Sequence, residues 1–403
     1  MRLAVVSPFV DRRHGTERAL AELLERLASI YHCEIHLYAQ RVEGLPIDPP
    51  GARASGKEDG ILWHKVPSIP GPPLLQFLSW LFLNSFFRSW DRLVRRLQFD
   101  LVLSPGLNCF DADIIIVHAL FHRLKELAFA EEGAPTSSLL RRFHRRAYYS
   151  MLAWLERRIY SSSKVSLAAV SWRTASFLSR YSLRHDVRVI PNGVDATEFS
   201  PEKRLALRAG TRSRYHFADA DCVLLLIGND WRNKGLSTIL EAMAACRDIP
   251  LRLLVAGQDQ AAPFFLEAAK SLGLGEKCRL ETTPMDAIHL YAASDAYVSP
   301  TREDAFALPP LEAMSCGLPV ITSMHNGGSQ IITENVDGFV LKDPWDASKL
   351  AGFLRGLQKQ SDLRLRIGAS ARRTALQYSW DRNARAVWEW LQRTLANELS
   401  QKR

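Results

Sequence analysis

The sequence predicts an α/β fold built from two parallel-sheet domains in series. Its 403 residues are too many for one compact core and suit two domains. Short apolar runs alternate with longer amphipathic runs, which is the pattern of strands and helices in a parallel sheet. Hydrophobic residues make up 47% of the chain and charged residues 24%, so the composition is that of a folded globular protein rather than a disordered one.

The first domain is expected to cover residues 1–195. Its strands are expected at 3–6, 34–38, 61–65, 101–104, 113–117, 165–170 and 187–190. Its helices are expected at 16–29, 75–97, 138–161 and 172–181. The alternation stops at Pro191-Asn192-Gly193, where proline and Asn-Gly favour a turn, so this segment is the predicted linker.

The second domain is expected over residues 200–379. Its strands are expected at 222–227, 251–256, 278–281, 296–299, 319–322 and 338–341, with helices alternating between them. The chain ends in two helical stretches, 347–378, broken near residue 361, and 380–399. Two such domains predict a ligand-binding cleft at the carboxyl ends of their strands, where parallel sheets bind ligands.

The cysteines and the first residues indicate the compartment. Six cysteines are scattered through the chain with no C-x-x-C pair, which excludes a common zinc or disulfide framework and suits a reducing cytoplasm. The first apolar run breaks at Pro8, too soon for a secretory segment. No stretch reaches the roughly 20 apolar residues of a transmembrane helix. We therefore expect a cytoplasmic protein.

The net charge of +9 is concentrated in two runs that also carry aromatic residues. Four arginines lie between 85 and 97 against one aspartate, and six lie between 137 and 158 against one glutamate. A basic, aromatic and amphipathic surface suits an anionic membrane face. Each run alone fits an ordinary half-buried helix with a solvated basic side equally well, but together they favour a membrane surface. The arginines belong to no recognisable nucleic-acid module, so no nucleic-acid partner is expected.

Three common catalytic motifs are missing from the sequence. No G-x-G-x-x-G follows a predicted strand, which disfavours a nicotinamide dehydrogenase. No G-x-x-x-x-G-K-[ST] is present, which disfavours a P-loop kinase or ATPase. No G-x-S-x-G is present for a hydrolase nucleophile. These absences leave nucleotide recognition to other loops.

The segment 301–320 carries the strongest functional signal. Its carboxylates Asp304 and Glu312 stand eight positions apart, and an apolar turn between them leads into a predicted helix. Leu308 would begin that helix, because the prolines after it are tolerated in a first turn, where their missing N–H would be unpaired anyway. The amides of Phe306, Ala307 and Leu308 would then be free to meet a phosphate or a hydroxyl. Free amides beside hydroxyl-binding carboxylates predict a nucleotide-sugar site.

The segment 222–235 runs from a predicted strand into Gly228 and reaches Lys234-Gly235 at a predicted helix start. Lys234 and Arg232 would hold a diphosphate of about two negative charges, one as a point charge and the other as a fork. The alternative is a surface cation at a helix N-terminus. Such a cation opposes the helix dipole, so it needs another reason to be there. We therefore expect Gly228, Arg232 and Lys234 to bind a diphosphate.

Both segments resemble the family 4 retaining glycosyltransferases. Residues 301–320 are similar to the family's glutamate-x7-glutamate signature, and residues 224–235 are similar to its diphosphate-binding loop. The resemblance covers nearly the whole chain and is most specific over 222–340. It implies a GT-B fold, in which two Rossmann-like domains face an interdomain cleft. It also implies that the last helix, 380–403, crosses back onto the first domain.

The resemblance assigns roles to the two carboxylates and the cations. Asp304 would grip hydroxyls of the donor sugar, and Glu312 would accept from the ribose hydroxyls. Family members usually carry Glu at position 304, so Glu303 is an alternative sugar contact. The arginine that the family carries shortly after the glycine is Asn229 in this chain, so Arg232 is the substitute that we expect.

Further donor contacts follow from the resemblance alone. Gly15 matches the family's glycine-rich first loop, where a glycine lets the backbone approach the diphosphate. His118 follows the predicted strand 113–117 and matches a histidine that contacts the donor sugar, with His122 as a competitor. Thr283 and Pro284 lie where backbone groups usually meet the nucleobase.

The resemblance implies a retaining hexosyltransferase that needs no cofactor and no metal ion, and the Asp111-x-Asp113 pair is interpreted as chance. The expected reaction is front-face substitution, in which the leaving diphosphate helps to deprotonate the acceptor. The second half is similar to lipopolysaccharide-core glucosyltransferases, so we expect a glycolipid or polysaccharide precursor as acceptor at the inner membrane face. A nucleotide-sugar epimerase and a non-catalytic nucleotide-sugar-binding protein of the same fold stay open.

Overall fold

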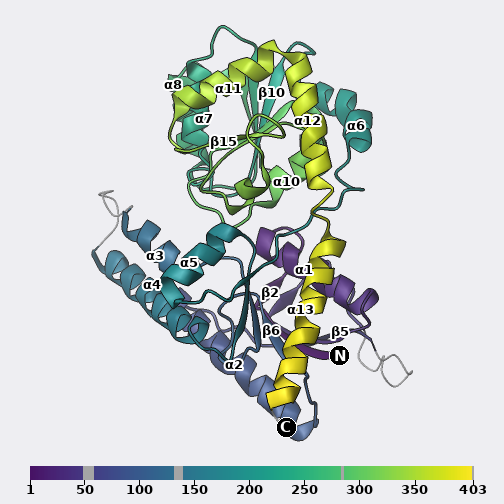
Figure 1. The fold of residues 1–403 in the computed structure, drawn as a ribbon. Coiled ribbons are helices and arrows are strands. Elements are labelled where there is room, and N and C mark those ends of the chain that lie inside the picture. The colour runs from purple at the N-terminus through teal and green to yellow at the C-terminus, as the bar shows by residue number, and fades with distance from the viewer. Residues whose placement is uncertain (49–58, 131–138, 283–285, 402–403) are drawn as a thin grey trace. The chain divides into compact units, whose positions relative to one another are not determined.

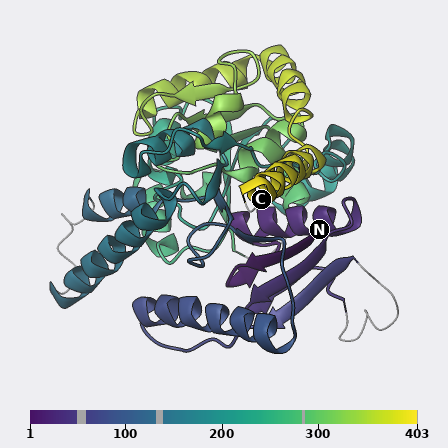
Figure 2. The ribbon, with the colours of Figure 1, turned by 60° about the horizontal axis from the view of Figure 1, so that its bottom comes forward.

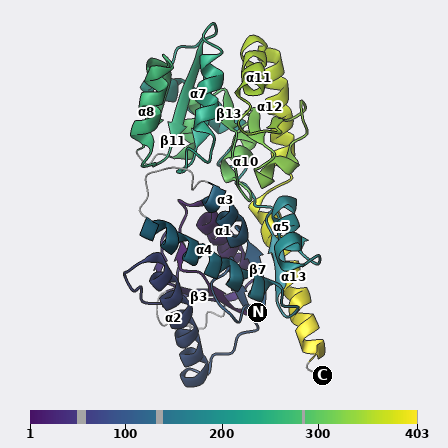
Figure 3. The same ribbon diagram turned by 90° about the vertical axis from the view of Figure 1, so that its left-hand side faces the viewer.

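The computed structural model describes residues 1–48, 59–130, 139–282 and 286–401. The chain divides into two compact units. The first comprises Met1–Pro191 with Trp380–Arg403, and the second comprises Asn192–Ser379. Each unit is built on one large parallel sheet with helices, as Figures 1 and 3 show. The predicted α/β fold with two Rossmann-like domains is therefore confirmed.

The first unit is built on a seven-stranded parallel sheet of order β5-β3-β1-β6-β7-β8-β9. Its strands are β1 (Arg2–Val6), β3 (Glu34–Ala39), β5 (Gly60–Lys65), β6 (Leu101–Ser104), β7 (Ile114–Val117), β8 (Ser166–Ala169) and β9 (Arg188–Val189). All seven predicted strands are present, with ends that match the prediction or differ from it by one residue. The sequence predicted these strands because strands buried on both faces of a parallel sheet appear as short, mainly apolar runs. A small sheet of β2 (Phe9–Val10) and β4 (Arg41–Val42) was not predicted.

The helices of the first unit are α1 (Gly15–Ser29), α2 (Pro73–Val94), α3 (Phe121–Ala130), α4 (Leu139–Tyr160), α5 (Trp172–Ser182) and α13 (Trp380–Gln401). Helix α3 was not predicted. Helix α2 ends before the predicted residue 97, because Arg96 takes a left-handed φ of 54° and the amide of Leu97 turns back to the carbonyl of Asp91. Helix α13 packs on α1, where Arg26 Nε donates to Asp381 at 2.7 Å.

The second unit is built on a six-stranded parallel sheet of order β12-β11-β10-β13-β14-β15. Its strands are β10 (Cys222–Ile227), β11 (Leu251–Ala256), β12 (Cys278–Glu281), β13 (Ala296–Ser299), β14 (Val320–Ser323) and β15 (Phe339–Leu341). Its helices are α6 (Pro201–Arg214), α7 (Leu236–Ala244), α8 (Ala262–Ser271), α9 (Ala287–Ala293), α10 (Leu308–Ser315), α11 (Ala347–Lys359) and α12 (Ser361–Ala375). The predicted break near residue 361 separates α11 from α12.

The core of the second unit lies on both faces of this sheet. Helices α7, α8 and α11 pack against buried residues such as Leu224 and Leu253 on one face. Helices α9 and α10 contact strands β10, β13 and β14 as well. Strands β10 and β11 pair along their whole length, from Cys222 opposite Leu251 to Ile227 opposite Ala256. Their following loops therefore begin at the same edge.

Two glycines show how closely the loops at this edge pack. Gly235 has φ +83°, and a Cβ there would lie 2.3 Å from the carbonyl oxygen of Pro300. Gly257 has φ +136°, and a Cβ there would lie 2.1 Å from the carbonyl oxygen of Gly228. Only glycine fits such contacts. The loops after β10, β11 and β13 are thus held backbone to backbone at the carboxyl edge of the sheet.

Candidate active site

Asp304 lies in the loop between β13 and α10, and the neighbouring loop fixes its backbone. Its amide donates to the carbonyl of His325 at 3.1 Å, and its carbonyl accepts from the amide of Gly327 at 2.8 Å. Its carboxylate is held at both oxygens. Oδ1 accepts from the amide of Phe306 at 3.1 Å, and Oδ2 accepts from Lys234 Nζ at 2.5 Å. The structure therefore joins two residues that the sequence singled out separately.

Lys234 reaches Asp304 across the bare backbone of Gly228. A Cβ at Gly228, where φ is +153°, would lie 3.0 Å from Cε and 3.2 Å from Cγ of Lys234. Any larger residue at position 228 would push against the lysine stem. The side chains of Lys234 and Asp304 are 15% and 22% exposed, so the ion pair is shielded from water but a ligand can still reach it.

Asn233 fastens the Lys234 loop to the Asp304 loop. Its Nδ2 donates to the carbonyl of Glu303 at 2.9 Å, and its Oδ1 accepts from the amide of Glu303 at 3.0 Å. The amide of Arg302 donates to the carbonyl of Asn233 at 2.7 Å. No local pattern indicates this role, because Asn233 and Glu303 are 70 residues apart in the chain.

The hydrogen bonds of Asn326 contradict the prediction that the amides before α10 are free. Its Oδ1 accepts from the amides of Ala307, at 3.2 Å, and Gly328, at 3.0 Å. Since the amide of Phe306 also donates within the protein, to Asp304, the prediction that the Phe306 and Ala307 amides are free was wrong. Helix α10 does begin at Leu308 with proline in its first turn, as predicted. Among the described residues, no hydrogen bond from the amide of Leu308 is found.

Glu312 lies on α10 and is 4% exposed. Its Oε2 accepts from the hydroxyl of Tyr291 at 2.7 Å. Burial and the nearby Glu312 carboxylate raise the pKa of Tyr291 well above its ordinary value, so the hydroxyl stays protonated and donates. Tyr291 thus orients the carboxylate. Sequence reasoning missed Tyr291, because it sits in the apolar helix α9 and looks like a core residue.

Arg232 does not join the Lys234–Asp304 pair. Its exposed guanidinium lies over the ring of Phe264 in α8, 5.7 Å from the ring centroid. Asn229, at the position where an arginine was expected, accepts from the amide of Gln258 at 3.0 Å. Thr283 and Pro284 lie outside the described residues. Lys234, rather than Arg232, is therefore the cation that the structure pairs with Asp304.

In the first unit, His118 directly follows β7 and is half-buried. Burial lowers the pKa of His118 to about 4, so its imidazole is neutral at pH 7. The competing His122 has a structural partner. Its Nδ1 lies 2.7 Å from Oε2 of the buried Glu156, which also accepts from the amides of Phe121 and His122 at the start of α3. His122 is thus held in place by Glu156, and His118 remains the candidate.

Gly15 faces open space, whereas Asp111 and Asp113 have partners within the protein. Gly15 begins α1, and a Cβ there would meet nothing within 4 Å, so the protein's own packing does not explain the glycine. Asp111 is held by both terminal nitrogens of Arg88, at 2.6 and 2.7 Å. Asp113 accepts from the amide of Val102 at 2.7 Å. Both aspartates therefore have hydrogen-bond partners within the first unit.

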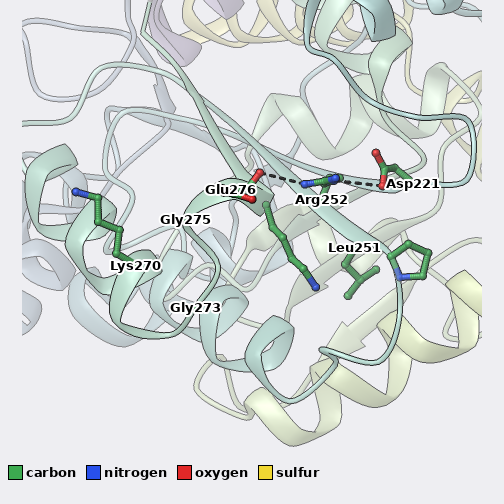
Figure 4. A pocket seen from close by; sticks show the side chains of 9 residues that line it. Asp221, Leu251, Arg252, Lys270, Gly273, Gly275 and Glu276 are labelled. Atoms are coloured by element: carbon green, nitrogen blue, oxygen red, sulfur yellow. Dashed lines mark hydrogen bonds and ion pairs between the residues drawn. The ribbon is translucent and has the colours of Figure 1, made fainter.

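A pocket of about 540 Å³ opens at the opposite end of the second unit's sheet, where β10 and β11 begin (Figure 4). Arg252 spans it, donating to Asp221 at 3.2 Å and to the carbonyl of Glu276 at 3.1 Å. Parallel sheets bind their ligands at the carboxyl ends of the strands, and this pocket lies at the amino ends. We therefore place the candidate site at Lys234, Asp304 and Glu312.

Two family models match the chain side by side. The model for Glycosyltransferase Family 4 matches residues 13–198, and the model for Glycosyl transferases group 1 matches residues 211–374. The lipopolysaccharide glucosyltransferase WaaG of Escherichia coli K12 is 27% identical over 257 residues, which are 62% of this chain and 68% of that protein. A D-inositol 3-phosphate glycosyltransferase of Salinispora arenicola is 29% identical over 218 residues, 50% of this chain and 48% of that protein. The chain thus matches about half the length of that relative.

Solved structures share the fold over almost the whole chain. A crystal structure of WaaG superimposes with a TM-score of 0.73 at 20% identity, covering 96% of this chain and 99% of that one. HepE of Anabaena, in complex with UDP and glucose, gives 0.70 at 16% identity, covering 97% and 99%. Two parallel-sheet units with these matches define a GT-B protein. The chain belongs to the glycosyltransferases, with a family 4 first half and a group 1 second half.

Proposed function

We propose that the protein is a retaining hexosyltransferase that moves a sugar from a nucleotide-diphospho-sugar to a hydroxyl acceptor. The observation that carries this proposal is the Lys234–Asp304 pair at the carboxyl edge of the second unit, with Glu312 in helix α10 directly after the Asp304 loop. One cation and two carboxylates match a ligand with an anionic diphosphate and two sets of hydroxyls. The HepE complexes with UDP and glucose support this donor class by analogy.

Each side chain has a role in holding the donor. Lys234 binds the diphosphate, Asp304 binds hydroxyls of the transferred sugar, and Glu312 accepts from the ribose hydroxyls. Glu312 is suited to this because Tyr291 fixes the direction of its carboxylate. Gly15 and His118 lie in the first unit, and their roles toward the donor rest on the family resemblance. The neutral imidazole of His118 can exchange hydrogen bonds with a hydroxyl without adding charge.

The chemistry we propose needs no side-chain nucleophile and no metal ion. The bond between the anomeric carbon and the diphosphate oxygen breaks, and the acceptor oxygen bonds to the same face of that carbon. The acceptor proton passes to the departing phosphate oxygen. Negative charge grows on the diphosphate as it leaves, and Lys234 is placed to stabilise it. Preorganised charge of this kind is worth about 3 kcal/mol per donor in the transition state.

Transfer with anomeric assignment tests the proposal. A thermal-shift screen of UDP-, GDP- and ADP-sugars identifies the donor, since a ligand at 100 times its Kd raises stability by about 2.7 kcal/mol. NMR of the product then shows whether the anomeric configuration of the donor is kept. An inverted product would contradict the retaining mechanism. An epimer formed from donor alone would favour an epimerase, and binding without transfer to any acceptor would favour a non-catalytic protein.

We further propose that the acceptor is a glycolipid or polysaccharide precursor reached at the cytoplasmic face of the membrane. The support comes from α2, which runs along the outside of the first unit (Figure 2). Among the described residues, no helix combines the length and the apolar character needed to cross a bilayer. Association with the membrane would therefore involve a surface of the protein.

The outer face of α2 is apolar and aromatic. Its exposed residues are Leu75, Leu78, Phe82, Phe86, Trp90, Leu93 and Val94, with exposures between 44% and 81%. The rings of Phe82, Phe86 and Trp90 follow one another at 6.5 and 6.3 Å between centroids. A helix that merely covers a sheet would carry polar residues on this face. The apolar residues therefore favour a partner there over the ordinary half-buried helix.

The charges around this face suit anionic lipids. The helix has one acidic residue, Asp91, which is buried and accepts from Tyr38 at 2.8 Å. Arg92 and Arg95 lie at its end, with side chains 43% and 62% exposed. In α4, Arg158 lies over the ring of Trp154, which is 58% exposed. Aromatic rings with arginines beside them are typical of proteins that lie on anionic membranes.

Flotation with vesicles tests this surface. We expect the wild type to float with phosphatidylglycerol vesicles and less with phosphatidylcholine vesicles. Replacing Phe82, Phe86 and Trp90 together by serine should abolish flotation. The matched control is Leu365→Ser on α12, which changes a residue that is 69% exposed in the second unit. Equal indifference of the wild type to both vesicles would contradict the membrane surface while leaving the transferase proposal intact.

A further inference from the structure

We infer that Asp304 sets the ligand preference of the site by favouring a nucleotide that still carries its sugar over the nucleoside diphosphate left after transfer. The inference rests on the proposed function, and it adds a second role for Asp304 besides contacting the sugar. The observation behind it is that the cation expected to hold the diphosphate is already paired with an anion of the protein itself.

The Lys234–Asp304 pair is preformed and firmly held. The ammonium and Oδ2 are 2.5 Å apart, and the lysine stem passes so close to Gly228 that a Cβ there would lie 3.0 Å from Cε of Lys234. Asp304 cannot follow the lysine freely, because Oδ1 accepts from Phe306 and its backbone is bonded to His325. An incoming diphosphate must therefore share Lys234 with Asp304 or take it away.

A nucleoside diphosphate alone is penalised by this arrangement. It supplies negative charge to Lys234 but offers Asp304 no donor in return. The Asp304 carboxylate, 22% exposed, is then left facing a second anion with the Phe306 amide as its remaining donor among the bonds described above. A shielded carboxylate that loses its cation is destabilised, and so is a pair of like charges in contact.

A nucleotide-sugar avoids this penalty. Its diphosphate takes Lys234 in the same way, but its sugar brings hydroxyl groups that donate to Asp304. The Asp304 carboxylate loses the Lys234 ammonium as a donor but gains sugar hydroxyls, so it stays hydrogen-bonded. This matters because leaving a buried acceptor without a hydrogen bond costs its full desolvation penalty. Asp304 therefore weakens the binding of the product more than that of the donor. The expected consequence is faster release of the nucleoside diphosphate after transfer.

Equilibrium binding to the wild type and to Asp304→Asn tests the inference. The probes are UDP, GDP and ADP, each paired with UDP-glucose, GDP-mannose and ADP-glucose. Asparagine keeps an oxygen for the Phe306 amide but removes the charge. We expect Asp304→Asn to bind the responding nucleoside diphosphate about three- to tenfold more tightly, as expected for loss of an ion pair of modest strength. Its affinity for the matching nucleotide-sugar should stay equal or fall.

Two controls separate this effect from general charge changes. Glu267→Gln on α8 removes the same charge from a side chain that is 76% exposed, and it should leave both affinities unchanged. In a Lys234→Ala background, Asp304→Asn should lose most of its effect, because the two side chains act as one unit. Equal melting temperatures of wild type and Asp304→Asn confirm that the variant is folded.

The outcomes distinguish this inference from the proposed function. Weaker or unchanged binding of the nucleoside diphosphate to Asp304→Asn would overturn the inference, even with donor binding and transfer intact in the wild type. A wild type that binds none of the six nucleotides would overturn the proposed function and the inference with it. Tighter binding of both ligands by the same factor would also overturn the inference, since no preference would then depend on Asp304.

Discussion

The two ends of the second unit's sheet each hold a cation paired with an aspartate, and the surroundings of the two pairs differ. At the amino end, Arg252 donates to Asp221 and to the carbonyl of Glu276 across an open pocket. At the carboxyl end, Lys234 meets Asp304 where loops from several strands converge. The Arg252–Asp221 pair connects elements of the fold. In the Lys234–Asp304 pair, the aspartate is also held by hydrogen bonds of its own backbone.

In this unit the pocket is therefore weaker evidence of a functional site than an ion pair whose members a ligand could bind. Asp221 also accepts from the amide of Ala218 at 2.8 Å, so the pair at the amino end closes a turn. At the carboxyl end, Gly235 and Gly257 bring backbones together with no room for a Cβ, and a Cβ at Gly228 would press on the Lys234 side chain. Lys234 there pairs with Asp304, and Glu312 lies on the helix that follows the Asp304 loop, which suits a ligand with both charge and hydroxyls.

The largest expected effect comes from removing each cation in turn. Lys234→Ala should lower turnover about 10²- to 10³-fold, the usual loss when one charge-stabilising donor is removed. Its thermal stability should change little, because a partly exposed ion pair contributes at most about 1 kcal/mol. Arg252→Ala should leave turnover unchanged and should lower the unfolding midpoint only slightly, because its ion pair with Asp221 is also partly exposed. Steady-state kinetics and denaturant unfolding of both variants measure this contrast. Equal turnover in the two variants would contradict the assignment of Lys234 to the active site.

An intermediate effect is expected from Tyr291→Phe. The variant removes the hydroxyl that donates to Glu312 at 2.7 Å and keeps the ring in the core. Glu312 then loses its orientation, and a hydrogen bond to a charged group is worth about 1.5 kcal/mol. Donor affinity, measured by calorimetry, should fall about tenfold with kcat less affected. Tyr215→Phe is the control, since that hydroxyl bonds Glu281 at 3.0 Å elsewhere in the unit. An unchanged Kd in Tyr291→Phe would remove Glu312 from the donor site.

The smallest effect is expected from the glycines. Gly228→Ala places a methyl group 3.0 Å from Cε of Lys234 and should weaken donor binding about threefold to tenfold. Gly273→Ala is the match at the other end, where φ is +67° and the nearest atom, in Arg247, is 3.9 Å from the added carbon. Both variants should lose about 1 kcal/mol of stability, because alanine is strained at positive φ. A donor affinity that responds equally to both substitutions would contradict the role of Gly228.

Much of the fold could be predicted because apolar runs reveal buried strands. Strands β10 (Cys222–Ile227) and β11 (Leu251–Ala256) match their predicted ends residue for residue. The missed helix α6 (Pro201–Arg214) is mostly polar, with Thr211 and Arg212 as its buried residues, so periodicity gave no signal. The small sheet of β2 and β4 escaped because two-residue strands are too short to show alternation.

The candidate site was predictable only in part. Lys234, Asp304 and Glu312 stand in segments whose spacing already suggested a nucleotide-sugar. Asn233 could not be found, since its bonds to residue 303 span 70 positions. The amide of Ala307 was expected to be free because its acceptor, Asn326, arrives from the loop after another strand. Contacts made by tertiary structure, rather than by local pattern, account for these misses.

A crystal structure with a bound nucleotide-sugar tests the central claim most directly. The account predicts a diphosphate oxygen within about 3 Å of Lys234 Nζ, the usual hydrogen-bond distance, with sugar hydroxyls on Asp304 and ribose hydroxyls on Glu312. The pocket around Arg252 should remain without nucleotide. A nucleotide-sugar seated at Arg252, with Lys234 still paired to Asp304, would contradict the account.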